Sequence, residues 1–175
     1  SIHAGPAYHE EDLRSRVNTC LDIMVACGTT RADTLTDTTA DNLGTSALET
    51  MLSIKKERAD DIDLRVASYS PLGFTDKEPQ RWEIFRKGAE MADFISALPE
   101  ADDQNEYPDN IGFEEHCRRT LETAMELDLP IHVHTDQRNE PGEDGTERLI
   151  EAVRKFGGPK PVDGEPRVWA VHMIS

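Results

Sequence analysis

The feature that most constrains this chain is a regular alternation of helix-type and strand-type segments along its length. Strand-type runs begin near residues 29, 64, 93, 130 and 167, and a segment with apolar residues at helical spacing precedes each one. Strict alternation of strand and helix predicts parallel strands joined by helical crossovers. The expected helices are 10–26, 46–59, 79–91, 113–128 and 145–156, and the expected strands are 29–35, 63–69, 93–98, 130–135 and 167–172.

Two α/β architectures fit this pattern. A doubly wound sheet of five strands would be complete within 175 residues, whereas a (β/α)8 barrel uses about 31 residues per unit and would be a little over half built. The barrel is favoured because the chain starts with a helix and stops on a strand, no glycine-rich phosphate loop follows the first strand, and polar residues gather at the strand ends. We predict an incomplete (β/α)8 TIM-type barrel of about five parallel strands, forming a single partial domain over residues 1–175, with the doubly wound sheet as the alternative.

Composition limits the partners and the compartment. Nineteen basic and 35 acidic residues give a net charge of −16, which repels nucleic acid and anionic lipid. No run approaches the roughly 18 apolar residues of a membrane span, and no basic-then-apolar signal segment opens the chain.

Cys20, Cys27 and Cys117 are odd in number, and the first two are seven residues apart on one helix face, so we expect buried thiols rather than a disulfide. A soluble, cytoplasmic protein is the expectation.

The densest group of chemically useful side chains lies on the strand 130–135 and just after it. Side chains alternate along a strand, so His132, His134 and Asp136 are expected on one face. Two imidazoles and a carboxylate at the carboxyl end of a parallel strand can converge on a metal ion. The alternative is a hydrogen-bonded histidine pair with a structural role. His172 ends the next strand at the matching position, so its imidazole is expected to face the same ligand as that of His134.

Other polar residues are weaker candidates. The acidic loop 100–109 lacks the ligand order and central glycine of a calcium loop, and we interpret it as a solvated rim. The residues expected in solvated turns or at the surface are Asp33, Asp37, Asp41, His3, His9 and His116.

With these residues in view, the chain resembles the cytosine-deaminase-like branch of the metal-dependent amidohydrolase superfamily, from roughly the second to the sixth barrel strand. The most specific matches are Val133-His134-Thr135-Asp136 and Ala170-Val171-His172, and the segments 48–67 and 88–95 also match. The resemblance implies a hydrolase that uses a metal-bound hydroxide to attack non-peptide carbon–nitrogen bonds of a small cyclic amide or amidine. It implies a divalent metal, zinc or iron, with His134 as a metal ligand. His172 is implied either to bind metal as well or to hydrogen-bond the hydroxide and the tetrahedral intermediate.

The resemblance also assigns roles near the metal and shows where this chain departs from the family. His172, Gln137 and Asp136 are implied as catalytic residues, and Gln137 and His172 as substrate-binding residues. Gln137 stands where the family has a proton-shuttling glutamate, and an amide cannot exchange protons as a carboxylate does. Pro71 stands where cytosine deaminases place a substrate-binding glutamine, which disfavours cytosine itself.

Further family ligands have no counterpart in this chain. The paired histidines of the first barrel strand and the metal-binding aspartate of the eighth strand are absent. We therefore expect the chain to be an internal piece of a longer amidohydrolase that acts on a small molecule, and a homo-oligomer is left open. A non-catalytic barrel that binds a small molecule is the alternative function.

Overall fold

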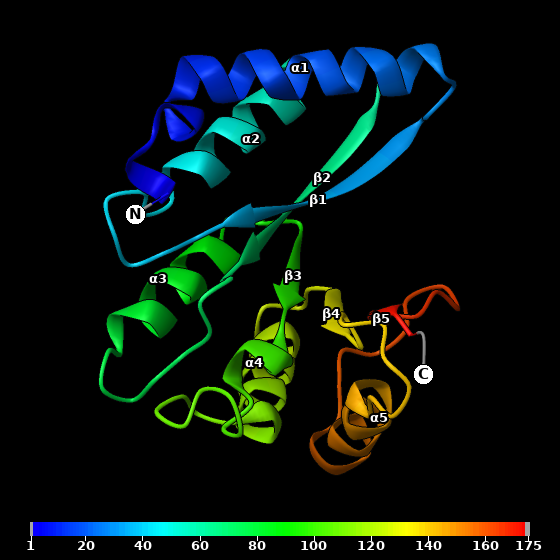
Figure 1. Cartoon of the computed structure of the whole chain (residues 1–175). Helices are drawn as coiled ribbons and strands as arrows, with labels where there is room; N and C mark the ends of the chain where they lie inside the picture. The colour runs from blue at the N-terminus through cyan, green and yellow to red at the C-terminus, as the bar shows by residue number, and fades with distance from the viewer. Residues whose placement is uncertain (1, 174–175) are drawn as a thin grey trace.

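The computed structural model describes residues 2–173 and places the five expected strands in one parallel sheet (Figure 1). The strands are β1 (Arg31–Asp37), β2 (Asp63–Tyr69), β3 (Phe94–Ala97), β4 (Ile131–Thr135) and β5 (Val168–His172). The helices are α1 (Glu10–Ala26), α2 (Ser46–Glu57), α3 (Gln80–Ala89), α4 (Phe113–Glu126) and α5 (Gly145–Phe156), with short 3-10 helices η1 (Ile2–Ala4), η2 (Pro6–Tyr8) and η3 (Pro99–Asp102).

Strand order decides between the two architectures. Neighbouring strands follow the chain order β1-β2-β3-β4-β5, and each pair is parallel. A doubly wound sheet reverses its strand order at a switch point, so that alternative is wrong. The chain forms a half-barrel of five parallel strands alternating with helices, as the spacing predicted.

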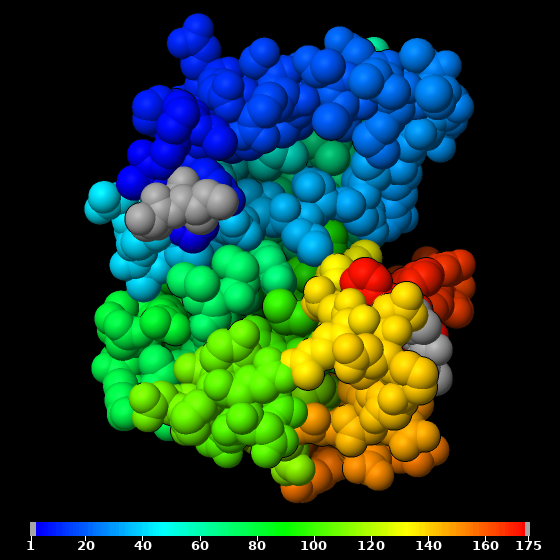
Figure 2. Space-filling view, viewed as in Figure 1, coloured from blue at the N-terminus to red at the C-terminus, as the bar shows by residue number. Residues whose placement is uncertain are grey.

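The sheet is strongly curved. In a flat sheet β1 and β4 would lie about 14 Å apart, three times the spacing of neighbouring strands. Here the carboxylate of Asp33 on β1 lies 3.8 Å from Nε2 of His132 on β4. Side chains on the concave face of the sheet therefore meet across the hollow of the half-barrel. In Figure 2 the light-blue region, which includes β1, lies next to the yellow-to-red region that includes β4 and β5.

Helices cover the convex face of the sheet and form two apolar clusters with it. One cluster packs α1 and α2 against β2 and is centred on Leu48, Ile54 and Val66, which are fully buried. The other packs α3, α4 and α5 against β3 and β4 through residues such as Phe85 and Leu121. Each such side chain contributes about 1.5–3 kcal/mol to the free energy of folding when it is fully buried. Because the apolar packing lies on the convex face, polar side chains can occupy the concave face.

The expected helices and strands all form, with ends shifted by one or two residues in most cases. β3 is the shortest strand because Pro99 follows it closely and opens η3. At the end of α5, Gly157 adopts a φ of +83° and a ψ of −170°, an extended conformation that is open to glycine and ends the helix.

Three expectations about burial are wrong. Cys20 and Cys27 are free thiols, but both are exposed, because the helix face that carries them points to solvent; Cys117 alone is buried. His116 was expected at the surface and is only 1% exposed. Asp102, in the loop interpreted as a solvated rim, is completely buried because it pairs with His116.

No helix within residues 2–173 is both long enough and apolar enough to cross a bilayer.

Candidate functional site

A row of polar side chains follows the carboxyl ends of the strands on the concave face. Asp37 ends β1, Tyr69 ends β2, His134 lies on β4 and His172 ends β5. Asp37 and Tyr69 are register partners, and the rings of Tyr69 and His134 are 6.4 Å apart between centroids. The carboxyl ends of parallel strands are where active sites form in barrels, so this row is the candidate site.

The structure brings His134 and His172 together, as their matching positions predicted. Nδ1 of His134 lies 3.3 Å from Nε2 of His172, and the ring planes are inclined by 59°. His172 is in register with Thr135 rather than with His134, so strand alternation alone would send its side chain to the other face. Its φ of +78° breaks that alternation and accompanies the turn of the ring toward His134.

The two imidazoles suit a divalent metal. In a tetrahedral zinc site with Zn–N bonds of about 2.0–2.1 Å, two ligand nitrogens lie about 3.3–3.4 Å apart. The 3.3 Å between the two ring nitrogens matches that separation. Burial lowers the pKa of His134 to about 4, and His172 and His132 add to the effect. The imidazole of His134 is therefore neutral at pH 7 and has a lone pair available. The residues present thus fit the implied metal at two of its coordination positions.

His132 shares the concave face with His134, as predicted, but lies lower in the half-barrel. Its ring contacts Phe94, 4.3 Å away between centroids, and its Nε2 approaches Asp33. Two residues of a strand span about 6.6 Å, which separates His132 from the mouth of the half-barrel. Burial lowers its pKa, an effect that outweighs the neighbouring Asp33. The structure therefore places His132 in the barrel interior, beneath the His134–His172 pair.

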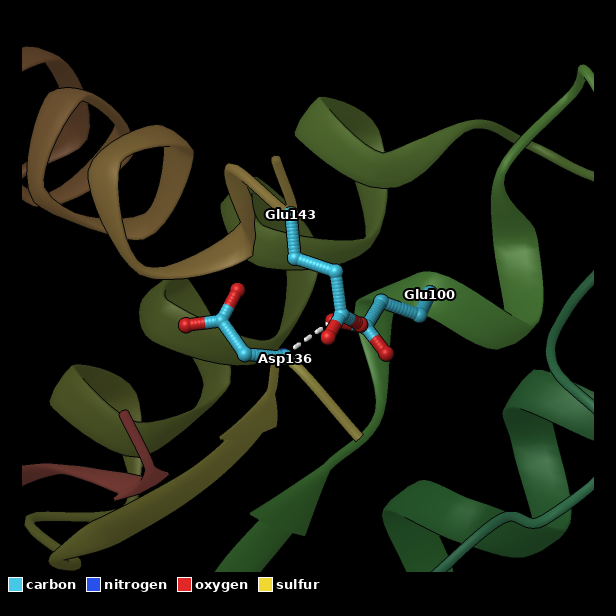
Figure 3. A group of neighbouring side chains, drawn as sticks. All are labelled: Glu100, Asp136 and Glu143. Atoms are coloured by element: carbon cyan, nitrogen blue, oxygen red, sulfur yellow. Dashed lines mark hydrogen bonds between the residues drawn. The ribbon is translucent and has the colours of Figure 1, made fainter. Parts of the chain in front are cut away.

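Asp136 does not share the face of the imidazoles, contrary to the expectation from alternation. It follows the last strand residue and adopts a φ of +57°, which redirects its side chain. The buried carboxylate accepts hydrogen bonds from Oγ1 and the backbone N–H of Thr146 in the first turn of α5. Figure 3 shows it pointing toward that helix. Thr146 also contacts Oγ1 of Thr135, whose side chain lies on the convex face.

Gln137 is exposed at the start of the loop after β4. Its backbone N–H donates to Oε2 of Glu100 at 3.5 Å, and the N–H of Asp136 donates to Oε1 of the same residue. Glu100 was part of the loop interpreted as a rim and was missed as a site residue. Its position after the neighbouring strand β3, three residues beyond Ala97, was the available signal.

Glu100, Asp136 and Glu143 form a close acidic group in which one oxygen of each lies within 4.8 Å of the others (Figure 3). Burial raises the pKa of Glu100, and the carboxylates of Glu143 and Asp136 raise it further against the lowering effect of the two backbone N–H bonds. Glu143 accepts the backbone N–H groups of Arg138 and Glu140 at 3.0 and 2.9 Å. All three carboxylates are thus bound by protein groups.

Tyr69 is a second site residue that the sequence reasoning missed. Desolvation raises the pKa of its phenol to about 12, with a further contribution from the Asp37 carboxylate, so the hydroxyl stays protonated at neutral pH. Asp37 is not a free turn residue, because the Tyr8 hydroxyl donates to its Oδ2 at 2.6 Å. Tyr69 ends β2 at the end of the half-barrel where active sites form, so we add it to the candidate site.

Comparisons with proteins of known structure show that other proteins share this fold. A crystal structure of 5-methylcytosine deaminase from Klebsiella pneumoniae with phosphonocytosine matches 93% of this chain at a TM-score of 0.75 and 23% identity. The same enzyme with 5-fluorocytosine gives a TM-score of 0.74 over 92% of the chain. N-isopropylammelide isopropylaminohydrolase from Burkholderia multivorans ATCC 17616 matches 75% of the chain at a TM-score of 0.60 and 18% identity.

In sequence, an uncharacterized protein of Haemophilus influenzae (strain ATCC 51907 / DSM 11121 / KW20 / Rd) is 34% identical over 115 residues, or 66% of this chain. No family model matches the sequence. The chain spans about a third of the length of these proteins, 37% of the Haemophilus protein and 36% of the Klebsiella deaminase. The resemblance seen in the sequence is thus confirmed at the level of the fold: the chain has the half-barrel fold of part of a deaminase and of an aminohydrolase.

Proposed function

We propose that this chain is part of a metal-dependent hydrolase of the cytosine-deaminase-like amidohydrolase group. Its reaction is the hydrolysis of a non-peptide carbon–nitrogen bond in a small cyclic amide or amidine. The observation that carries the proposal is the His134–His172 pair, whose ring nitrogens lie 3.3 Å apart at the carboxyl ends of β4 and β5. The fold shared with a methylcytosine deaminase and an isopropylaminohydrolase supports it.

In this proposal His134 and His172 hold a divalent metal, zinc or iron, through the ring nitrogens that face each other. A bound divalent metal would lower the pKa of its coordinated water to near 7 and so supply a nucleophile at neutral pH. His172 is exposed and lies at the very end of its strand, so it can serve as a ligand or can donate a hydrogen bond to the oxygen that becomes negative during attack.

Gln137 and Tyr69 are the proposed substrate contacts. Gln137 is exposed three residues after His134, and its carboxamide can donate and accept hydrogen bonds with a cyclic amide. The ring of Tyr69 stands across from His134 and offers a flat apolar wall with a hydroxyl donor. Pro71 offers no side-chain hydrogen bond where a cytosine-binding glutamine would stand, so cytosine is not the proposed substrate.

Asp136 is not proposed to move protons at the metal. Its carboxylate is buried and bound by Thr146, which turns it away from the imidazoles. We assign it instead to holding the turn after β4 in place.

Metal binding tests the proposal. We expect the protein, equilibrated with Zn²⁺ and freed of excess, to retain about one ion per chain by elemental mass spectrometry. His134→Ala removes a ligand and abolishes retention, whereas the matched His9→Ala, at an exposed histidine, leaves it unchanged. An equal metal content in wild type and His134→Ala contradicts the proposal. Amine release from methylcytosine and N-isopropylammelide by metal-loaded protein then surveys the substrate class.

A second candidate function is metal-independent binding of a small heterocycle without turnover. The observation that favours it is Gln137, because a carboxamide in the place of a carboxylate cannot exchange protons. Tight binding of a heterocycle that survives His134→Ala, without amine release, would support this function over hydrolysis.

A further inference from the structure

The turn that follows His134 is held by carboxylates from two directions. Oε1 of Glu100 accepts the backbone N–H of Asp136 at 2.5 Å (Figure 3), and its Oε2 accepts the backbone N–H of Gln137 at 3.5 Å. Glu143 accepts two further N–H groups of the same loop, those of Arg138 and Glu140. Four backbone donors of the loop 136–140 thus end on two glutamate side chains.

The Glu100 bonds act where the backbone is strained. Asp136 adopts a φ of +57°, a left-handed conformation that is unfavourable for most residues with a Cβ atom. The hydrogen bonds that Glu100 accepts from Asp136 and Gln137 can offset that cost. On its other side Asp136 is bound by Thr146. Glu100 and Thr146 therefore fix Asp136 from opposite directions, two residues after His134.

The chain leaves room for this arrangement at the start of α5. A Cβ atom on Gly145 would lie 2.7 Å from Oε1 of Glu100 and 2.9 Å from Oδ1 of Asp136. Gly145 has no positive φ, so its lack of a side chain serves the close approach of the two carboxylates rather than a special backbone conformation. The N-terminal end of α5 also carries partial positive charge, which favours carboxylates there.

We propose that Glu100 is a positioning residue of the candidate site: by binding the backbone N–H groups of Asp136 and Gln137, it sets the orientation of His134 toward His172 and the placement of Gln137. The inference rests on the proposed function, since His134 is there a metal ligand. Groups that orient metal ligands commonly change metal affinity by about 10- to 100-fold when they are removed.

The experiment is a Co²⁺ titration, monitored by visible absorption, of the wild-type chain, Glu100→Leu and Glu100→Gln. Leucine removes both acceptors, and we expect Co²⁺ affinity to fall at least about tenfold, with an altered absorption spectrum because the ligand geometry changes. Glutamine keeps a carbonyl oxygen for the N–H of Asp136, so we expect affinity within about threefold of wild type. Glu140→Gln, which removes a charge from an exposed residue of the same loop, is the matched control and leaves affinity unchanged.

Two additional variants keep each outcome decisive. Gly145→Ala crowds the Glu100 carboxylate, and with it Oδ1 of Asp136, without altering Glu100 itself. We expect it to weaken Co²⁺ binding, and it replaces Glu100→Leu as the test if that variant does not fold. His134→Ala separates the two proposals. If it leaves Co²⁺ binding intact, the proposed function is wrong. If it abolishes binding while Glu100→Leu and Gly145→Ala bind like wild type, only the role of Glu100 is wrong. A loss in Glu100→Gln as large as in Glu100→Leu would also overturn that role, because charge rather than hydrogen bonding would then matter.

Discussion

Oδ2 of Asp102 lies 2.7 Å from Nδ1 of His116, and both side chains are almost completely removed from solvent. The other oxygen, Oδ1, accepts the backbone N–H of Phe74 at 2.8 Å. Asp102 follows β3, His116 lies on α4, and Phe74 follows β2. One buried carboxylate thus joins two loops at the mouth of the half-barrel to the helix between β3 and β4.

Loss of the Asp102 carboxylate should destabilise the fold strongly. We expect Asp102→Ala to lower the free energy of unfolding by about 3–5 kcal/mol, because it leaves the N–H of Phe74 and the ring of His116 buried without their acceptor. Urea unfolding monitored by circular dichroism measures this free energy of unfolding. The control is Asp109→Asn, which breaks an ion pair with Lys77 that is more than 70% exposed on both sides and should cost about 1 kcal/mol or less. Equal effects of the two substitutions would disprove the structural role of Asp102.

Gly73 should tolerate no side chain. It adopts a φ of +64°, and an added Cβ would lie 2.0 Å from Oδ1 of Asp102. We expect Gly73→Ala to cost at least about 3 kcal/mol, since the strain of a left-handed alanine adds to displacement of a buried carboxylate. Gly164, with a φ of +84° and nothing within 4 Å of an added Cβ, isolates the strain, and Gly164→Ala should cost about 1–2 kcal/mol. Comparison of their unfolding midpoints checks the difference, and similar midpoints would count against the close packing of Gly73.

Glu115 should make stability depend on pH at the acid end. Hydrogen bonds from Arg118 and then Arg119 lower its pKa to about 2, against the effect of burial. A lowered pKa stabilises the fold above the ordinary value of 4.5, and this contribution disappears as the pH falls toward 2. We expect Glu115→Gln to destabilise the protein at pH 7 and to approach wild type between pH 4.5 and 2.

The control for Glu115 is Glu83→Gln, at an exposed glutamate of α3. Urea unfolding at a series of pH values gives the free-energy difference for both variants. A difference between wild type and Glu115→Gln that stays constant from pH 7 to pH 3 would contradict the lowered pKa.

The three thiols should differ in reactivity. Burial raises the pKa of the Cys117 thiol to about 12, so almost none of it is thiolate at pH 8. Cys20 and Cys27 are exposed. In a reaction with a chromogenic disulfide we expect two thiols to react rapidly and the third only after unfolding. The double variant Cys20→Ser/Cys27→Ser should show no rapid reaction, and a rapid thiol in that variant would place Cys117 at the surface.

Helices and strands were predictable here because their signals are local. The acidic start and the glycine end of α5, or the alternation of Ile131, His132 and Val133 on β4, involve only neighbours in the chain. The closeness of His134 and His172 was also predictable, because parallel strands in sequential order bring equivalent ends together. The turn of the His172 ring toward His134 was not, because it depends on the positive φ of His172. The roles assigned to His134, His172, Asp136 and Gln137 remain predictions.

The remaining errors come from contacts between distant residues. Alternation placed Asp136 beside the histidines, but its positive φ and its bonds to Thr146, ten residues later, redirect it. The sequence around His116 predicts a surface residue, because its buried partner Asp102 lies fourteen residues earlier in the chain. Glu100 acts on a turn 36 residues further along the chain. No periodicity in the sequence encodes such pairs.

The 3.8 Å approach of Asp33 to His132 has a consequence for how such a sheet is assembled. Five strands with their helices already bend far enough for the first and fourth to touch through their side chains. Curvature is therefore a property of these strands and their own packing, and does not require a closed ring to impose it. Any strand that pairs with β1 or β5 would meet a sheet that is already curved, and the histidine pair at its edge is formed by β4 and β5 alone.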